Sequence, residues 1–201
     1  MSLVLENTET DTRTRILLVA ERLFREIGYQ KTTVADIAKV LKMSPANVYR
    51  FFDSKTAIHQ GVAVRLMSEV EAAVTTIAAE PLSPKDRLRE ILATIHHMNA
   101  ERYVGDSKLH EMVALAMEEN WDICDAHIAR LGEMVGRVIA EGVAAGQFKP
   151  CDLEMTAKCV CVSMCRFFHP QMIAECADKQ IDVPLEVMIE FVIGAISTTK
   201  V

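Results

Sequence analysis

The chain has 201 residues, half of them hydrophobic and a quarter charged, which is an ordinary globular composition. No stretch reaches the roughly 18 uncharged apolar residues that a membrane helix needs, and the polar N-terminus lacks the layout of a signal peptide. We therefore expect a cytoplasmic protein with no membrane partner. The net charge is −6, yet residues 1–55 hold nine basic and seven acidic side chains, so a mild basic excess lies at the N-terminal end.

Apolar residues recur at helical spacing along most of the chain, and strand patterns are absent, so the sequence predicts an all-α fold. A first helix is expected from about Thr12 to Ile27, ended by Gly28, with residues 1–11 flexible. The second helix begins after Thr32 or Thr33, whose hydroxyl can cap its free amides.

A short turn at residues 42–43 leads to a third helix, which Ser44 can cap and in which Pro45 takes the first position. Three short helices, the second and third joined by such a turn, indicate a helix-turn-helix unit. Five apolar side chains are expected to form its core: Phe24, Ile37, Ala38, Val48 and Phe52.

A long fourth helix is expected from Lys55 to about Ala79, followed by a break at two prolines. The later helices are predicted by periodic runs that glycines and prolines separate: about 85–103, 107–119, 121–146, 152–168 and 184–198, with a further short helix in 171–179.

The outward face of the third helix carries side chains that suit DNA. Asn47 can pair with an adenine edge, and Arg50 can bind a guanine edge or a phosphate. The Tyr49 hydroxyl and the Lys55 ammonium can each reach a phosphate. Helical periodicity alone fits a plain three-helix core with a polar surface equally well.

A set of residues in this region resembles, in order and spacing, the signature of the TetR family over about residues 12–58. The set is Arg15-Ile16-Leu17, Ala20, Leu23-Phe24, Gly28-Tyr29, Thr32-Thr33-Val34, Ile37-Ala38, Met43-Ser44, Val48-Tyr49-Arg50-Phe51-Phe52 and Ser54-Lys55. The resemblance implies a homodimeric DNA-binding regulator, usually a repressor that a small ligand releases from a palindromic operator.

By position, the resemblance makes Thr33, Tyr49 and Lys55 phosphate contacts. The expected groove-facing residues are Pro45, Ala46, Asn47 and Arg50, with Ser44 as the cap that starts this recognition helix. Asn47 stands where the family often has a small residue. The expected domains are residues 1–54 for DNA binding and residues 55–201 for ligand binding and dimerisation.

The helices expected at 152–168 and 184–198 are apolar on nearly all sides, so they need cover on two sides. A second subunit can supply one cover, as in the four-helix dimer interface that the resemblance implies, while a single large core is the alternative. The candidate interface residues are Val162, Cys165, Phe168, Met188, Phe191, Val192 and Ala195.

A pocket for an unidentified, largely apolar effector is expected among the helices at 85–103, 107–119, 121–146 and 152–168. Its candidate residues are polar side chains within apolar stripes, together with adaptable apolar walls: Met98, Asn99, Met112, Trp121, His127, Met164 and Phe167. Alternatively, Asn99 and His127 are core residues whose polar groups are hydrogen-bonded within the protein, and the methionines are ordinary core residues.

The sequence offers no catalytic motif, so neither an enzyme nor a cofactor is expected. Cys159, Cys161 and Cys165 do not suit a structural zinc site, because the first two diverge on a helix and two ligands fall short. Small buried hydrophobes are the favoured interpretation, with metal or thiol sensing as alternatives. A helical protein that carries or senses a hydrophobic molecule without binding DNA is the alternative function.

Overall fold

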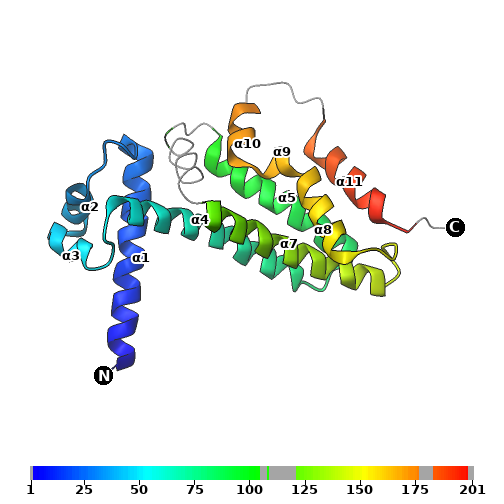
Figure 1. Ribbon diagram of the computed structural model, residues 1–201, viewed down its shortest axis with the longest axis horizontal. Helices are drawn as coiled ribbons and strands as arrows, with labels where there is room; N and C mark the ends of the chain where they lie inside the picture. The colour runs from blue at the N-terminus through cyan, green and yellow to red at the C-terminus, as the bar shows by residue number, and fades with distance from the viewer. Residues whose placement is uncertain (1, 105–107, 109–120, 177–182, 199–201) are drawn as a thin grey trace. The chain divides into compact units, whose positions relative to one another are not determined.

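A computed structural model describes residues 2–104, 108, 121–176 and 183–198, with a helical backbone alone for residues 2–10. Within these ranges the regular secondary structure is α-helix, apart from one isolated antiparallel bridge between Phe148 and Ser197, as the all-α prediction requires (Figure 1). The described residues form two compact units. The first unit holds residues up to Leu66, with Lys108, and the second holds residues 67–104 and those from Asp122 onward.

The first unit contains α1 (Ser2–Ile27), α2 (Val34–Leu41), α3 (Pro45–Tyr49) and the first part of α4 (Lys55–Ala78). The predicted start of the first helix near Thr12 was wrong, because α1 begins at Ser2. No glycine or proline precedes Gly28, so nothing in the sequence stops the helix from extending toward the N-terminus. Gly28 ends α1 with a φ of 93°, a conformation that favours glycine.

The predicted core of the first unit is confirmed: none of Phe24, Ile37, Ala38, Val48 and Phe52 is more than 3% exposed. Ile16 and Ala20 of α1 and Ile58 and Val62 of α4 are also buried in it. Gly61 of α4 lets the two long helices approach closely, since a Cβ atom there would lie 2.7 Å from Cδ2 of Leu17.

The second unit contains the rest of α4, α5 (Pro84–Tyr103), α7 (Trp121–Ala144) and α8 (Leu153–Ser163). Three shorter helices follow: α9 (Cys165–Phe168), α10 (Pro170–Cys176) and α11 (Leu185–Ile196). Apart from Lys108, the helix predicted at 107–119 lies outside the described residues.

The single helix predicted at 152–168 was wrong, because it is broken between α8 and α9 at Met164. Met164 has φ −91° and ψ 3°, and its amide donates to the carbonyls of Val160 and Cys161 in a tightened turn. The Ser163 hydroxyl donates to the Cys159 carbonyl at 2.8 Å, a bond that commonly bends helices.

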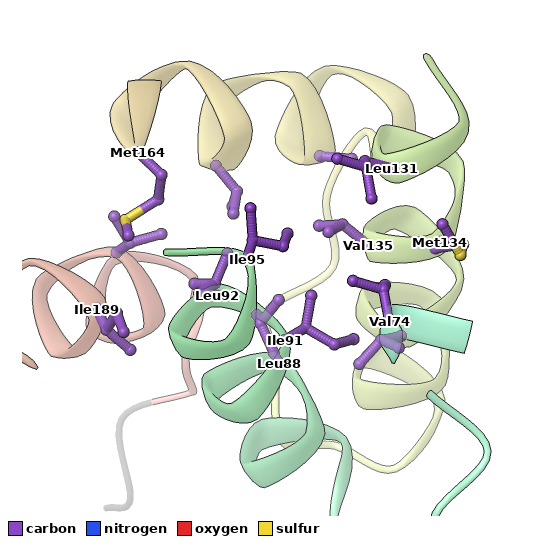
Figure 2. Packing of buried hydrophobic residues seen from close by; sticks show 14 of the residues in the cluster. Val74, Leu88, Ile91, Leu92, Ile95, Leu131, Met134, Val135, Met164 and Ile189 are labelled. Carbon is purple, nitrogen blue, oxygen red and sulfur yellow. The ribbon is translucent and has the colours of Figure 1, made fainter. Parts of the chain in front are cut away.

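The core of the second unit is built around α5. Figure 2 shows Leu88, Ile91, Leu92 and Ile95 of this helix among side chains of α4, α7 and α11. All four are no more than 1% exposed. Because these side chains would be exposed to water in the unfolded chain, their burial stabilises the unit through the hydrophobic effect.

Candidate nucleic-acid interface and the second unit

The α3 helix is set by its local sequence, as predicted. Ser44 is the N-cap, its hydroxyl oxygen accepts from the Asn47 amide at 3.2 Å, and Pro45 occupies the first turn. Val48 is fully buried and anchors the helix to the core. The opposite face, with Pro45, Ala46, Tyr49 and Arg50, is exposed, and Asn47 is half-buried. The unit therefore presents a short helix with hydrogen-bonding side chains on a fixed support.

The Thr33 side chain, a predicted phosphate contact, is exposed and closes a capping box at the start of α2. Its hydroxyl donates to Oδ2 of Asp36 at 2.6 Å and accepts from the Asp36 amide at 3.2 Å, while the Thr33 amide donates to the same carboxylate at 2.9 Å. The hydrogen bonds from the Thr33 hydroxyl and amide hold the pKa of Asp36 below its ordinary value. The Thr33 side chain therefore stabilises the start of α2 through its hydrogen bonds with Asp36.

Lys55, another predicted phosphate contact, is half-buried and turned into its own unit. Its ammonium donates to the carbonyls of Tyr29, Gln30 and Thr32 at 2.9, 3.3 and 3.1 Å. It also lies 4.3 Å from the centre of the Tyr29 ring, a cation–π contact.

Arg13 is a residue of this region that the sequence reasoning missed. Its guanidinium donates to the Phe51 carbonyl just after α3 at 2.6 Å and lies 4.2 Å from the centre of the Phe52 ring. Arg13 and Phe51 are 38 residues apart in the chain, so no local motif could have revealed the contact.

The described residues that were predicted to contact the effector differ in their burial and in their partners within the second unit. Met164 and Phe167 are buried in the α5-centred cluster, and Met98 packs against it. Asn99 is buried, and its amide nitrogen donates to the Phe168 carbonyl at 2.8 Å. Met112 and the Trp121 side chain lie outside the described residues.

His127 joins a polar cluster between α4 and α7. Its Nδ1 lies 2.6 Å from Oε1 of Glu71, and Arg130 donates to both oxygens of the same carboxylate at 2.8 and 2.9 Å. Burial lowers the pKa of His127 despite the nearby carboxylate. Burial alone would raise the pKa of Glu71, but the hydrogen bonds from Arg130 and His127 outweigh it and leave that pKa below its ordinary value. A neutral imidazole therefore donates Nδ1–H to an ionised glutamate.

An apolar surface runs over α8 and α11. Val162 and Phe191, two predicted interface residues, are 73% and 71% exposed, and Cys165 and Ala195 are exposed as well. Three other predicted members contact the core of their own chain: Val192 is buried in it, and Phe168 and Met188 pack against it. The sequence reasoning missed Met155 of α8 and Val187 of α11, both more than half exposed.

These exposed residues follow helical spacing, since Met155, Cys159 and Val162 lie on one side of α8 and Val187 and Phe191 on one side of α11. A groove of about 290 Å³ lies between the two helices. Its walls are Asp152, Met155, Thr156, Cys159, Val160, Ser163, Phe191, Val192, Ala195 and Ile196.

The thiols show two kinds of environment. Cys161 is half-buried, and burial raises the pKa of its thiol to about 11, which keeps it protonated and unreactive. Cys159 and Cys165 are exposed. Among the described residues, no three histidine, cysteine or acidic side chains come together as metal ligands, and no helix is both long and apolar enough to cross a membrane.

Both units contain a region that matches a known protein family. Residues 16–62 match the model of the bacterial regulatory proteins of the tetR family. Residues 84–188, more than half of the chain, match the model of the tetracyclin repressor-like C-terminal domain.

Among curated sequences, an uncharacterized HTH-type transcriptional regulator of Bacillus subtilis (strain 168), YhgD, is 25% identical over 159 residues, 73% of this chain and 77% of that one. A TetR/AcrR-family regulator from Thermobifida fusca has a similar fold, with a TM-score of 0.63, 23% identity, and coverage of 92% of this chain and 95% of that one. Thermus thermophilus FadR, a TetR-family repressor solved with lauroyl-CoA, gives a TM-score of 0.60 at 19% identity, covering 94% and 97%.

Proposed function

Since the chain belongs to the TetR family of bacterial regulatory proteins, we propose that it is a homodimeric repressor that leaves a palindromic operator when a small, largely apolar effector binds. As a family member it is a DNA-binding transcriptional regulator with a C-terminal ligand-binding domain. In this proposal residues 1–54 bind DNA, residues 55–201 bind the effector and the second subunit, and the protein acts in the cytoplasm without catalysing a reaction.

The observation that carries the proposal is the α3 surface. Val48 fixes the helix from inside, while Asn47, Tyr49 and Arg50 stand on its outer side with no core function. Asn47 and Arg50 are the proposed base contacts, and Tyr49 and Thr33 the proposed phosphate contacts, with Ser44 capping the recognition helix. Pro45 and Ala46 are small enough to let the helix approach the groove closely.

A binding titration by fluorescence anisotropy, using DNA selected from a random pool, tests these assignments. Arg50→Ala should weaken binding to the selected site more than binding to a scrambled site. The loss of binding free energy should be about 1–3 kcal/mol and should depend on one base position. Tyr49→Phe should weaken both sites equally. Arg137→Ala, at an exposed arginine of the second unit, is the control that should change neither. If selection returns no sequence motif, the repressor proposal fails and the alternative of a hydrophobic carrier gains support.

The proposed dimer interface is the α8–α11 surface, where Val162, Val187 and Phe191 expose large apolar side chains. Burying them against a second copy would remove this surface from water. A dimer also suits the operator, because two recognition helices about 34 Å apart read successive major grooves.

Analytical ultracentrifugation at micromolar concentration tests the dimer. Phe191→Glu should convert it to a monomer, because the interface would then bury an unpaired charge. Met172→Glu is the matched control, since Met172 is an exposed apolar residue of α10 that does not line the groove. A wild-type protein that sediments as a monomer would contradict the dimer.

The effector is proposed to bind in the second unit near Met98, Met164 and Phe167, whose side chains form a deformable apolar wall. Asn99, Met112, Trp121 and His127 stay predicted contacts. The fold relative with lauroyl-CoA makes that molecule a concrete probe. Lauroyl-CoA should raise the thermal midpoint and release DNA in the same concentration range, because a ligand that favours one state must show both effects. No change in either measurement would exclude acyl-CoA effectors of this length.

A further inference from the structure

We propose that Lys55 is a positioning residue that holds the α1–α2 turn in place, and that it does not contact a DNA phosphate. The inference rests on the proposed DNA-binding function of the first unit. It differs from the role that the family resemblance predicts for this position.

Every donor of the Lys55 ammonium has an acceptor within its own unit. A lysine ammonium has three N–H donors, and the structure gives it three carbonyl acceptors, at Tyr29, Gln30 and Thr32. The three carbonyls converge on one point as they would around a small cation. A phosphate could therefore gain Lys55 only if these carbonyls lost it.

The turn that Lys55 contacts connects α1 to α2. Tyr29 is buried, and its ring contacts two side chains one helical turn apart on α4: the Lys55 ammonium at 4.3 Å and the stacked His59 ring at 4.4 Å between centres. Thr32 is fully buried, and its hydroxyl donates to the Gly28 carbonyl at 2.8 Å. The next residue, Thr33, is the N-cap of α2. Lys55 thus joins the start of α4 to the start of α2.

A second lysine, Lys31, lies in the same turn. Lys31 is exposed. Lys55 donates to the carbonyls of Gln30 and Thr32, the residues on either side of Lys31. The chain therefore provides a matched lysine that has the same charge and neighbourhood without the carbonyl contacts.

Lysine acetylation followed by mass spectrometry tests the inference on the free protein. The reagent attacks a neutral, accessible amine, so Lys55 should be modified several-fold more slowly than Lys31, Lys39 and Lys42, which are exposed. Modification of Lys55 at the rate of Lys31 would overturn the proposal. This readout needs no DNA and no variant, so it stands even if a substitution prevents folding.

The salt dependence of DNA binding separates the two roles of Lys55. A lost phosphate contact lowers the slope of log K against log salt by about 0.9 per chain, whereas a lost positioning contact lowers affinity by the same factor at every salt concentration. We expect Lys55→Met to leave the slope unchanged, to weaken binding and to lower the thermal midpoint. Lys31→Met should leave the midpoint unchanged.

Lys55→Arg supplies the decisive comparison, because a planar guanidinium keeps the charge but cannot converge on three carbonyls. It should behave like Lys55→Met. Restored binding by Lys55→Arg, or a reduced salt slope in Lys55→Met, would overturn the proposal. If the wild-type protein binds no selected DNA, the proposed function fails, while the labelling rates and thermal midpoints still decide the role of Lys55.

Discussion

Gly142 and Phe148 pack directly against each other where the chain turns back after α7. A Cβ atom on Gly142 would overlap the Phe148 ring, with even the ring's Cγ only 3.1 Å away. The Gly142 carbonyl also accepts the amides of Gln147 and Phe148, at 2.9 and 3.1 Å. Phe148 is 1% exposed, so its ring has no free space to move into. The absence of a side chain at Gly142 is therefore a packing requirement.

Gly142→Ala should destabilise the protein. The displaced Phe148 ring should cost about 1–3 kcal/mol, partly offset by the roughly 1 kcal/mol that alanine gains over glycine in a helix. Gly132→Ala in the same helix is the control, because a Cβ there meets nothing within 4 Å. Urea unfolding should show a net loss of free energy for the first variant and a gain of up to about 1 kcal/mol for the second. Equal effects of the two substitutions would contradict the packing argument.

Features that depend on neighbouring residues could be predicted from the sequence. The caps at Thr33 and Ser44 and the stop at Gly28 each follow from a few adjacent residues, and the structure contains all three. The burial of Val48 follows from helical spacing alone. The family signature added the role of α3, since spacing alone fits any amphipathic helix equally well.

Features that depend on distant partners could not be predicted. From the sequence, Lys55 is a cation that is free to bind DNA. In the structure it contacts the turn around Thr32, 23 residues earlier in the chain. From the sequence, His127 is a polar residue on an apolar helix face. In the structure it contacts Glu71, 56 residues earlier in the chain. No glycine or proline marks the helix break at Met164. The break arises from hydrogen bonds that the Ser163 hydroxyl and the Met164 amide donate to carbonyls of the preceding turn.

Removal of the Arg13 side chain should loosen the end of α3. Arg13→Ala loses the bond to the Phe51 carbonyl and the contact with the Phe52 ring, and because the site is exposed we expect a cost of about 1 kcal/mol. Arg15→Ala is the control, at an exposed arginine on the same helix. Thermal unfolding should show a lower midpoint for Arg13→Ala alone. A midpoint equal to that of Arg15→Ala would show that the carbonyl contact contributes nothing.

The capping box at α2 should make the first unit sensitive to acid. The pKa of Asp36 is lower in the folded protein than in the unfolded chain, so its contribution is complete above the unfolded value of about 3.9 and is lost as the pH falls through the lower folded value. Asp36→Ala should therefore be less stable than the wild type at neutral pH, and the difference should shrink below about pH 4. Thr33→Ser keeps the hydroxyl and should behave like the wild type. A difference independent of pH would mean that the ionised carboxylate is not what stabilises α2.

The His127–Glu71 pair should make stability fall between neutral and mildly acidic pH. Burial lowers the folded pKa of His127 below the unfolded value of about 6.5, so the unfolded chain binds its proton first as the pH falls. Stability is then complete above that unfolded value and declines as the pH falls through the folded one. His127→Gln keeps a donor for Glu71 without titrating, so its unfolding free energy should vary less between about pH 5 and 8. His97→Gln, at an exposed histidine of α5, should retain the wild-type dependence. The opposite sign, with the wild type gaining stability toward pH 5 relative to His127→Gln, would mean that His127 is charged in the folded protein and pairs with Glu71 as an ion.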